Sequence, residues 1–173
     1  MIPYGKQWID NNDIQAVVDI LQSDWLTTGP KVEEFEKAFS DYLGVNNSVS
    51  VNSGTSSLEL SLRALGVKDR EVITTTNTCT AVPNSIINAG GYPVLTDINK
   101  SSISIDPNSL KASINAKTKA VILVHMAGFI QEDIEEIVQI CQDSNVVLIE
   151  DCCRSLGAEY KGIKSGCSGK ISF

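Results

Sequence analysis

Two short stretches without a polar residue constrain the fold of this chain most strongly. Residues 120–124 read AVILV and residues 146–149 read VVLI. Wholly apolar strands are typical of parallel sheets covered on both faces, because a strand with one solvent-exposed face alternates between apolar and polar residues. Between the two stretches, Ile134, Ile137 and Cys141 recur at helical spacing. This order predicts an α/β fold with a mainly parallel sheet and helices on both of its faces.

The same alternation of strand and helix patterns is expected along the whole chain. Pro30 suits the first turn of a helix and Gly44 its end, where a left-handed residue is common. Helices are predicted over 14–21, 30–43, 58–65, 81–89, 107–114 and 134–141, and strands over 48–51, 72–76, 92–96, 120–124 and 146–149. A further extended run begins at Lys170. Because domains usually end in polar, exposed segments, a truncated C-terminus is expected, and a short final strand is the alternative.

Composition and charge exclude several classes of partner. The formal net charge is −7, which disfavours nucleic acid, and no stretch approaches the roughly 20 apolar residues that span a membrane. The N-terminus lacks the pattern of a signal peptide. Five cysteines form no C-x-x-C pair and His125 is the single histidine. The sequence therefore predicts a cytoplasmic protein with reduced thiols, without a metal site and without nucleic-acid or membrane partners.

Three segments that follow predicted strands are candidates for ligand binding, because ligands of open α/β sheets bind beyond the carboxyl ends of the strands. The segment 53–56 (SGTS) combines glycine, hydroxyls and a helix start, which favours a phosphate, although a serine that caps the helix is the simpler alternative. Neither G-x-G-x-x-G nor a P-loop motif occurs, so a dinucleotide or P-loop nucleotide is not indicated.

Glu150 and Asp151 follow a buried strand, and residues 76–80 (TNTCT) follow another. A carboxylate there can hold a cationic ring nitrogen, and the polar segment 76–80 can form the wall of a cofactor site. Helix capping is the alternative for the acids, and a hydroxyl-rich turn that caps the next helix is the alternative for 76–80. His125 is interpreted as structural. Cys152 and Cys153 are expected to be small buried packing residues.

Together these segments resemble the DegT/DnrJ/EryC1/StrS family of pyridoxal-phosphate-dependent nucleotide-sugar aminotransferases. The resemblance covers essentially the whole chain, and eight matches in register make it specific. In order, the matching segments are 2–7 (IPYGKQ), 26–30 (LTTGP) with 34–36 (EFE), 52–55 (NSGT), 90–94 (GGYPV) with Asp97, 124–128 (VHMAG), 149–151 (IED), 156–158 (LGA) with 160–162 (YKG), and 172–173 (SF).

The resemblance implies a cofactor, a reaction and a set of site residues. The cofactor is pyridoxal 5'-phosphate, and Asp151 pairs with its pyridine nitrogen and keeps it protonated. The residues that match cofactor-phosphate ligands are Gly54, Thr55, Ser56 and Ser172, and those that match substrate contacts are Tyr4, Leu26, Thr27, Thr28 and Gly29. The reaction is transfer of an amino group, typically from glutamate, to a nucleotide-linked 4-keto-6-deoxy sugar. The opening and the LTTG stretch look most like the branch for UDP-linked 4-keto-6-deoxy-hexosamines in pseudaminic acid synthesis.

Three features depart from the family pattern. The Schiff-base lysine belongs to an SF-x-x-x-K motif and is expected about four residues past Phe173, so no catalytic residue is assigned within the chain. Cys79 stands where an aromatic residue often stacks on the cofactor ring. Arg154 stands where a histidine or glutamine usually approaches the ring hydroxyl, and its permanent charge favours the phenolate.

The chain is therefore expected to form the N-terminal part, residues 1–173, of a large domain with the fold of aspartate aminotransferase, without the small C-terminal domain. The parent enzyme is expected to be a homodimer with active sites at the subunit interface, and the chain alone to be inactive. One alternative is a sugar dehydratase of the same family, in which histidine replaces the lysine. The other is a non-catalytic α/β protein that binds a phosphorylated ligand or a partner chain.

Overall fold

The computed structural model describes residues 5–173, which form two compact units, residues 5–50 and residues 51–173. The first unit contains helices α1 (Asn11–Leu21) and α2 (Pro30–Leu43). Asp10 caps α1 by accepting backbone hydrogen bonds from Asn12 and Asp13. Pro30 opens α2 and Gly44 ends it with a φ of 73°. Both predicted helices are confirmed, and α1 begins at Asn11, three residues before the predicted start.

The strand predicted over 48–51 is wrong, because these residues lie outside every strand of the described chain. The alternating pattern is present, but Val49 is 78% exposed, so the apolar positions do not form a buried face. A side chain of α2 takes the hydrogen bonds that a neighbouring strand would otherwise make. The Glu36 carboxylate accepts the Ser50 backbone N–H at 2.7 Å and the Ser50 hydroxyl at 2.8 Å.

The second unit is built on a five-stranded parallel sheet in the order β2-β1-β3-β4-β7. Its strands are β1 (Glu71–Thr75), β2 (Tyr92–Thr96), β3 (Thr118–Val124), β4 (Val147–Asp151) and β7 (Ile171–Ser172). The two apolar stretches form β3 and β4, which are neighbours at the centre of the unit, with Ile122 beside Ile149. The predicted α/β fold with a mainly parallel sheet is confirmed.

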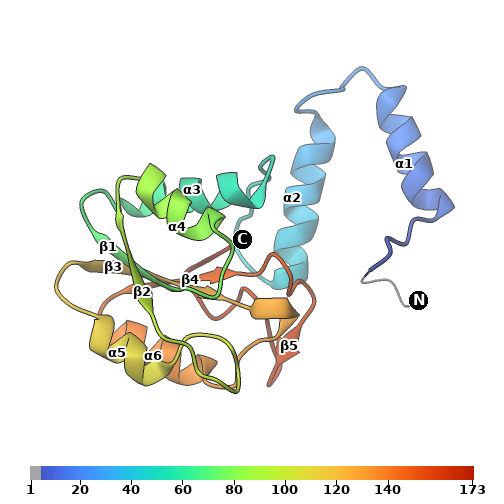
Figure 1. Ribbon diagram of the computed structural model, residues 1–173. Helices are drawn as coiled ribbons and strands as arrows, with labels where there is room; N and C mark the ends of the chain where they lie inside the picture. Colours follow the sequence, from blue (N-terminus) through green and yellow to red (C-terminus); the bar gives the residue numbers. More distant parts are fainter. Residues whose placement is uncertain (1–4) are drawn as a thin grey trace. The chain divides into compact units, whose positions relative to one another are not determined.

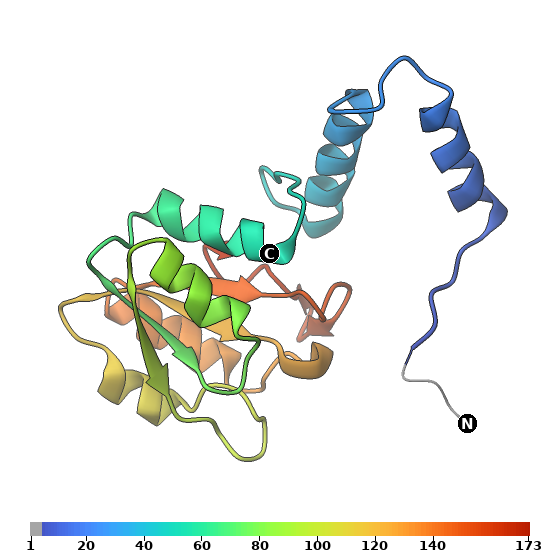
Figure 2. The same cartoon turned by 45° about the horizontal axis from the view of Figure 1, so that its top comes forward.

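Helices cover both faces of this sheet, as Figures 1 and 2 show. On one face, α3 (Gly54–Leu65) and α4 (Ala81–Asn88) pack on a core that includes Ile122 and Ile149. On the other, α5 (Pro107–Ser113) and α6 (Ile134–Asp143) pack on a core that includes Leu123 and Leu148. Consecutive residues of a strand point to opposite faces, so each of the central strands contributes to both cores. Among residues 5–173 there is no helix with the length and apolar character that a membrane crossing requires.

The C-terminal third contains small elements that the sequence patterns did not predict. Strands β5 (Glu159–Tyr160) and β6 (Ile163–Lys164) form a two-residue antiparallel hairpin, and a 3-10 turn, η1, spans Met126–Gly128. Strands of two residues carry no periodic signal, so a pattern search cannot find them. The extended run predicted at 170–173 is the short edge strand β7, which pairs in parallel with β4.

Candidate functional site

The start of α3 combines open backbone donors with exposed hydroxyls. Ser53 caps the helix and accepts the Ser56 backbone N–H at 3.2 Å, so the simple capping interpretation is correct for this serine. Gly54 and Thr55 then form the first turn, where backbone N–H groups lack carbonyl partners within the helix. Thr55 is exposed. The arrangement can bind an anion without rearrangement of the backbone.

Asp151 ends β4 and faces the same side of the sheet as α3. Ile149, two residues earlier, packs in the core beneath α3 and α4, and side chains two apart on a strand share a face. Asp151 is 9% exposed, and its Oδ1 accepts the Cys153 backbone N–H at 3.1 Å. The carboxylate therefore lies at the carboxyl edge of the sheet with its orientation fixed by the following turn.

The structure brings the α3 start and the turn after Asp151 together. A β-carbon added to Gly54 would lie 3.1 Å from the Cys153 sulfur, so only glycine fits there without a shift. Burial, followed by the Asp151 carboxylate and with a smaller effect from Cys79, raises the pKa of the Cys153 thiol to about 11. Gly54, Cys79, Asp151 and Cys153 thus belong to one neighbourhood on the α3 face.

Arg154 and Ser172 lie at the same edge but in different surroundings. A β-carbon added to Gly128 would lie 2.7 Å from the Arg154 carbonyl oxygen. The turn η1, which contains Gly128, therefore packs directly against the turn after Asp151. Ser172 pairs with Glu150 in the β4–β7 register, and its hydroxyl lies beside Gly166. Its assignment as a phosphate ligand stays a prediction.

The residues predicted to contact substrate lie in the first unit, where Leu26 is 66% exposed and Thr28 has a φ of 46°. Thr27 and Gly29 are exposed or half-buried positions of the same segment, which leads into α2. Tyr4 lies outside the described residues. The predicted roles of this segment remain expectations.

The expectation that both adjacent cysteines are buried packing residues is wrong. Cys153 is exposed and Cys152 is half-buried, because both lie in the turn beyond the end of β4 rather than within the strand. The thiols are not activated, since burial raises the pKa of Cys152 to about 12. Thiolate nucleophiles need a lowered pKa, so neither cysteine has the character of one.

A buried hydrogen-bonded pair at the carboxyl edge of the sheet was missed by the sequence analysis. His125 follows β3, Glu150 lies in the neighbouring strand β4, and their Nε2 and Oε2 atoms are 2.9 Å apart with both side chains fully buried. Although burial raises the pKa of Glu150, hydrogen bonds from His125, Gly169 and Gly166 outweigh it and hold that pKa below its usual range. The available signal was that both residues end adjacent apolar strands of a parallel sheet.

His125, Glu150 and Cys152 also place three potential metal ligands within 4.8 Å of one another. Their donor atoms are already engaged by protein groups. The Glu150 oxygens accept backbone N–H groups as well as His125, and the Cys152 sulfur accepts the Ser165 hydroxyl at 3.1 Å. In the structure these three residues therefore form a hydrogen-bonded cluster.

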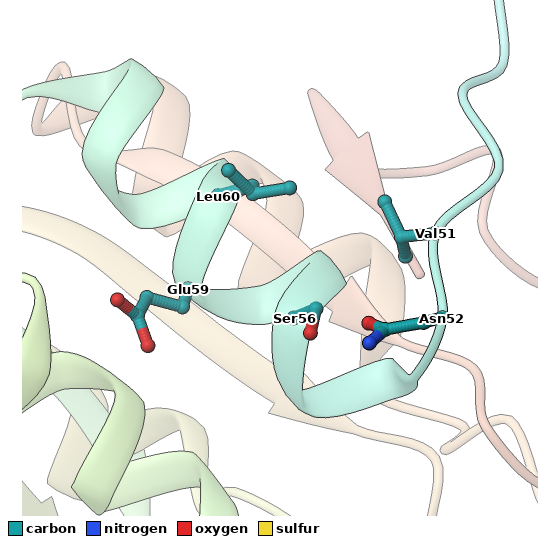
Figure 3. Close-up of a pocket in the computed structure, with 5 residues that line it drawn as sticks. All are labelled: Val51, Asn52, Ser56, Glu59 and Leu60. Atoms are coloured by element: carbon teal, nitrogen blue, oxygen red, sulfur yellow. The ribbon is translucent and has the colours of Figure 1, made fainter.

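A hollow of about 430 Å³ lies along α3 and is lined by Val51, Asn52, Ser56, Glu59 and Leu60. Figure 3 shows Asn52 and Ser56 at the start of the helix, with Glu59 and Leu60 further along it. Of the predicted cofactor residues it includes Ser56 alone. The ring-binding assignment of Asp151 therefore depends on the strand geometry and not on this hollow.

These residues fit a flat, phosphorylated ring with a protonated nitrogen. The α3 start offers donors for the phosphate, and Asp151 on the same face offers an anionic acceptor. The fold and the site define the class of pyridoxal-phosphate-dependent transferases, in which solved sugar aminotransferases share this architecture. The profile of the DegT/DnrJ/EryC1/StrS aminotransferase family matches residues 7–173, and the chain belongs to that family. Pyridoxal phosphate is the cofactor of this family.

Three curated relatives cover nearly all of the chain. An uncharacterized protein, MJ1066, from Methanocaldococcus jannaschii is 43% identical over 97% of this chain and 44% of its own length. The spore coat polysaccharide biosynthesis protein SpsC of Bacillus subtilis is 38% identical over 92% of this chain and 41% of its own. A GDP-perosamine synthase from Caulobacter vibrioides is 37% identical over 93% and 44%, respectively. The chain thus spans less than half the length of these relatives.

Solved structures are similar over the same extent. The PLP-form of the sugar aminotransferase Spr1654 from Streptococcus pneumoniae has a TM-score of 0.93 at 33% identity, over 99% of this chain and 47% of the other. Helicobacter pylori PseC, an aminotransferase of pseudoaminic acid biosynthesis, has a TM-score of 0.88 at 32% identity over 95% and 44%. The GDP-4-keto-6-deoxymannose-3-dehydratase ColD, as an H188N mutant with GDP-perosamine, has a TM-score of 0.91 at 26% identity over 98% and 46%.

Proposed function

We propose that the chain is the N-terminal, cofactor-binding part of the large domain of a nucleotide-sugar aminotransferase. The full enzyme transfers an amino group, with glutamate as donor, to the keto group of a nucleotide-linked 4-keto-6-deoxy sugar. The observation that carries this proposal is the approach of the α3 start to the turn after Asp151, with 3.1 Å between the Gly54 β-carbon position and the Cys153 sulfur. Relatives that are named for sugar or polysaccharide synthesis support the substrate class.

The α3 start binds the phosphate end of the cofactor in this proposal. The backbone N–H groups of Gly54 and Thr55 and the hydroxyls of Thr55 and Ser56 donate to phosphate oxygens, and the positive end of the helix dipole adds to the attraction. The Ser56 hydroxyl is already held 3.0 Å from that of Ser53. Little side-chain entropy is therefore lost when the phosphate binds.

Asp151 binds the opposite end of the ring. Its carboxylate accepts the N–H of the protonated pyridine nitrogen, and its burial strengthens this charge-assisted bond relative to water. The bound cofactor supplies an electron sink for proton transfer at the carbon next to the amine. Cys79 would offer the ring less contact area than an aromatic residue, Arg154 would donate toward the ring hydroxyl, and Ser172 would be a further donor to the phosphate.

The substrate-binding segment contains Leu26, Thr27, Thr28 and Gly29, together with Tyr4. These residues contact the nucleotide sugar, and UDP-linked 4-keto-6-deoxy-hexosamines are the proposed branch of substrates, supported by the resemblance to PseC. The full-length enzyme is a cytoplasmic homodimer with its active sites between subunits. Amino transfer also requires a lysine that follows Phe173, so the 173 residues alone bind cofactor without turnover.

A sugar dehydratase of the same family is the second candidate, because ColD is among the structural neighbours. The residue in the x-x-x-K position after Phe173 separates the two reactions. Lysine there indicates the aminotransferase and histidine the dehydratase. A stop codon directly after Phe173 would favour the non-catalytic binding protein.

Binding measurements test the cofactor proposal on the chain itself. Pyridoxal phosphate and pyridoxal are titrated separately into the unmodified chain and into the Ser56→Ala and Ser61→Ala variants. Ser61 is the matched control, because it lies on the same helix and its hydroxyl donates to the Ser57 carbonyl of that helix, at 2.8 Å. We expect Ser56→Ala to weaken pyridoxal phosphate but not pyridoxal. Equal affinity of all three proteins for pyridoxal phosphate, or failure of the unmodified chain to bind it, contradicts the proposal.

A further inference from the structure

We propose that Glu150 is a positioning residue that sets strand β7 and Asp151 in register for cofactor binding, an inference that rests on the proposed function. Glu150 is fully buried and points to the α5/α6 face, as Leu148 does. Its neighbour Asp151 points to the opposite face, on which α3 lies, so one strand carries the predicted cofactor ligand on one side and an anchored acid on the other.

Every oxygen of the Glu150 carboxylate has two donors. Oε1 accepts the backbone N–H groups of Ser168, at 2.7 Å, and of Gly169. Oε2 accepts the Gly166 N–H at 3.1 Å and is 2.9 Å from His125 Nε2. His125 Nδ1 is buried without a partner, so the ring proton belongs on Nε2, where it is donated to Glu150. Three of the four donors come from the turn 166–169.

That turn leads directly into β7, which is held by few other bonds. Only two residue pairs, Ile149 with Ile171 and Glu150 with Ser172, form the β4–β7 ladder. The Lys170 N–H bonds to the Leu148 carbonyl at 2.9 Å, and the Phe173 N–H bonds to the Glu150 carbonyl at 3.1 Å. A ladder this short is weak alone. The hydrogen bonds of the Glu150 carboxylate to the turn 166–169 therefore contribute much of the stability that holds β7 and the segment that follows it against β4.

The same network reaches Asp151 through the backbone. The His125 N–H donates to the Asp151 carbonyl at 3.1 Å, and the Cys152 N–H donates to the Phe173 carbonyl at 2.7 Å. A displacement of the turn 166–169 therefore moves β7 and Asp151 relative to each other. Cofactor ligands on both need to be held in place, because small displacements of binding groups cost affinity.

Glutamine cannot replace Glu150 in this network. Its amide has one oxygen and one NH₂ group, so whichever way the amide turns, two of the four donors face another donor. Gly169→Ala disturbs the same network at a donor residue of the turn, and it leaves the charge of Glu150 unchanged. A β-carbon there would lie 2.9 Å from the Leu148 carbonyl oxygen and 3.2 Å from Glu150 Oε1.

The experiment compares pyridoxal phosphate affinity in the unmodified chain, Glu150→Gln, Gly169→Ala and the controls Ile137→Val and Ile137→Ala. Ile137 is fully buried on α6, and its two truncations give graded losses of stability on the same face of the sheet without removing a hydrogen bond. The affinity of each network variant is compared with that of the Ile137 variant whose midpoint of urea unfolding is most similar. Amide hydrogen exchange of Gly166, Ser168, Gly169 and Phe173 is measured in parallel, with α3 amides as the internal reference.

We expect Glu150→Gln and Gly169→Ala to weaken pyridoxal phosphate at least about tenfold and to accelerate exchange in the turn and at Phe173, while α3 stays protected. The Ile137 variants should keep the original affinity. If Glu150→Gln does not fold, Gly169→Ala decides. Unchanged affinity in a folded variant of the network, or an equal loss in a stability-matched Ile137 variant, overturns the proposal. Failure of the unmodified chain to bind instead refutes the proposed function itself.

Discussion

Gly128 is expected to be the least replaceable glycine near the candidate site, and Gly128→Ala measures how tightly η1 packs on the turn after Asp151. Gly128 has a φ of 90°, and an added β-carbon would lie 2.7 Å from the Arg154 carbonyl oxygen. Two costs are therefore expected. A left-handed conformation costs a non-glycine residue roughly 1–2 kcal/mol. Relief of the contact requires backbone movement, at about 1–3 kcal/mol for a strained site.

Gly162 is the matched control, because it has nearly the same φ, 81°, and no atom lies within 4 Å of its β-carbon position. Gly162→Ala should therefore show the conformational cost alone, about 1–2 kcal/mol. Gly128→Ala should lose about 2–5 kcal/mol in total. The assay is urea unfolding followed by circular dichroism, with the slope checked for constancy.

The difference between the two variants isolates the contact with Arg154. A difference of about 1–3 kcal/mol confirms that the loops after β3 and β4 are packed against each other. Equal losses in the two variants would refute the contact, and with it the close assembly of these loops around Asp151.

Three further predictions concern other parts of the chain. Asp151→Asn should weaken pyridoxal phosphate by roughly 10–150-fold, the loss of a charge-assisted hydrogen bond of about 1.5–3 kcal/mol, whereas binding within twofold of the original in a fluorescence titration would contradict the ring assignment. Ser53→Ala should destabilise the chain by about 1 kcal/mol through loss of the α3 cap, and unchanged thermal unfolding would show that the cap contributes nothing. Hydrogen bonds from the Ser50 backbone and hydroxyl lower the pKa of Glu36 below its ordinary value of 4.5. These bonds therefore contribute stability that is present above pH 4.5 and is lost as the pH falls through the lower pKa of the folded state. The Ser50 amide resonance should report this transition by NMR, and Glu36→Gln should abolish it.

The sheet and its helices were predictable because their signals are long and unambiguous. The apolar runs at 120–124 and 146–149 became the adjacent central strands β3 and β4, and Gly44 and Gly66 end helices in the left-handed conformation. The strand expected at 48–51 failed for a physical reason. Alternation predicts a strand only if a neighbour supplies hydrogen bonds, and here Glu36 supplies them instead.

The site could be predicted in part. The apolar strand before Asp151 placed this residue at the carboxyl edge of the sheet, where ligands bind. The strand expected before Thr55 does not form, and the α3 start is brought to that edge by the approach of Gly54 to Cys153. The residue pattern alone did not decide which of two adjacent acids faces the ligand, because the face depends on the register of β4, and Asp151 was assigned through the family resemblance. In the structure Glu150 points to His125 and Asp151 to the α3 face. Long-range pairs such as Glu150 with Gly166 arise from the fold and leave no local pattern.

The most direct measurement of the central claim is a ¹H–¹⁵N NMR titration of the chain with pyridoxal phosphate. If the α3 start and Asp151 hold opposite ends of one ring, the amides of Gly54, Thr55 and Ser56 and those of Asp151 and Cys153 should shift together with a single dissociation constant. Inorganic phosphate should shift the first group alone. Movement of only one group with pyridoxal phosphate, or two groups with different dissociation constants, would contradict a shared site.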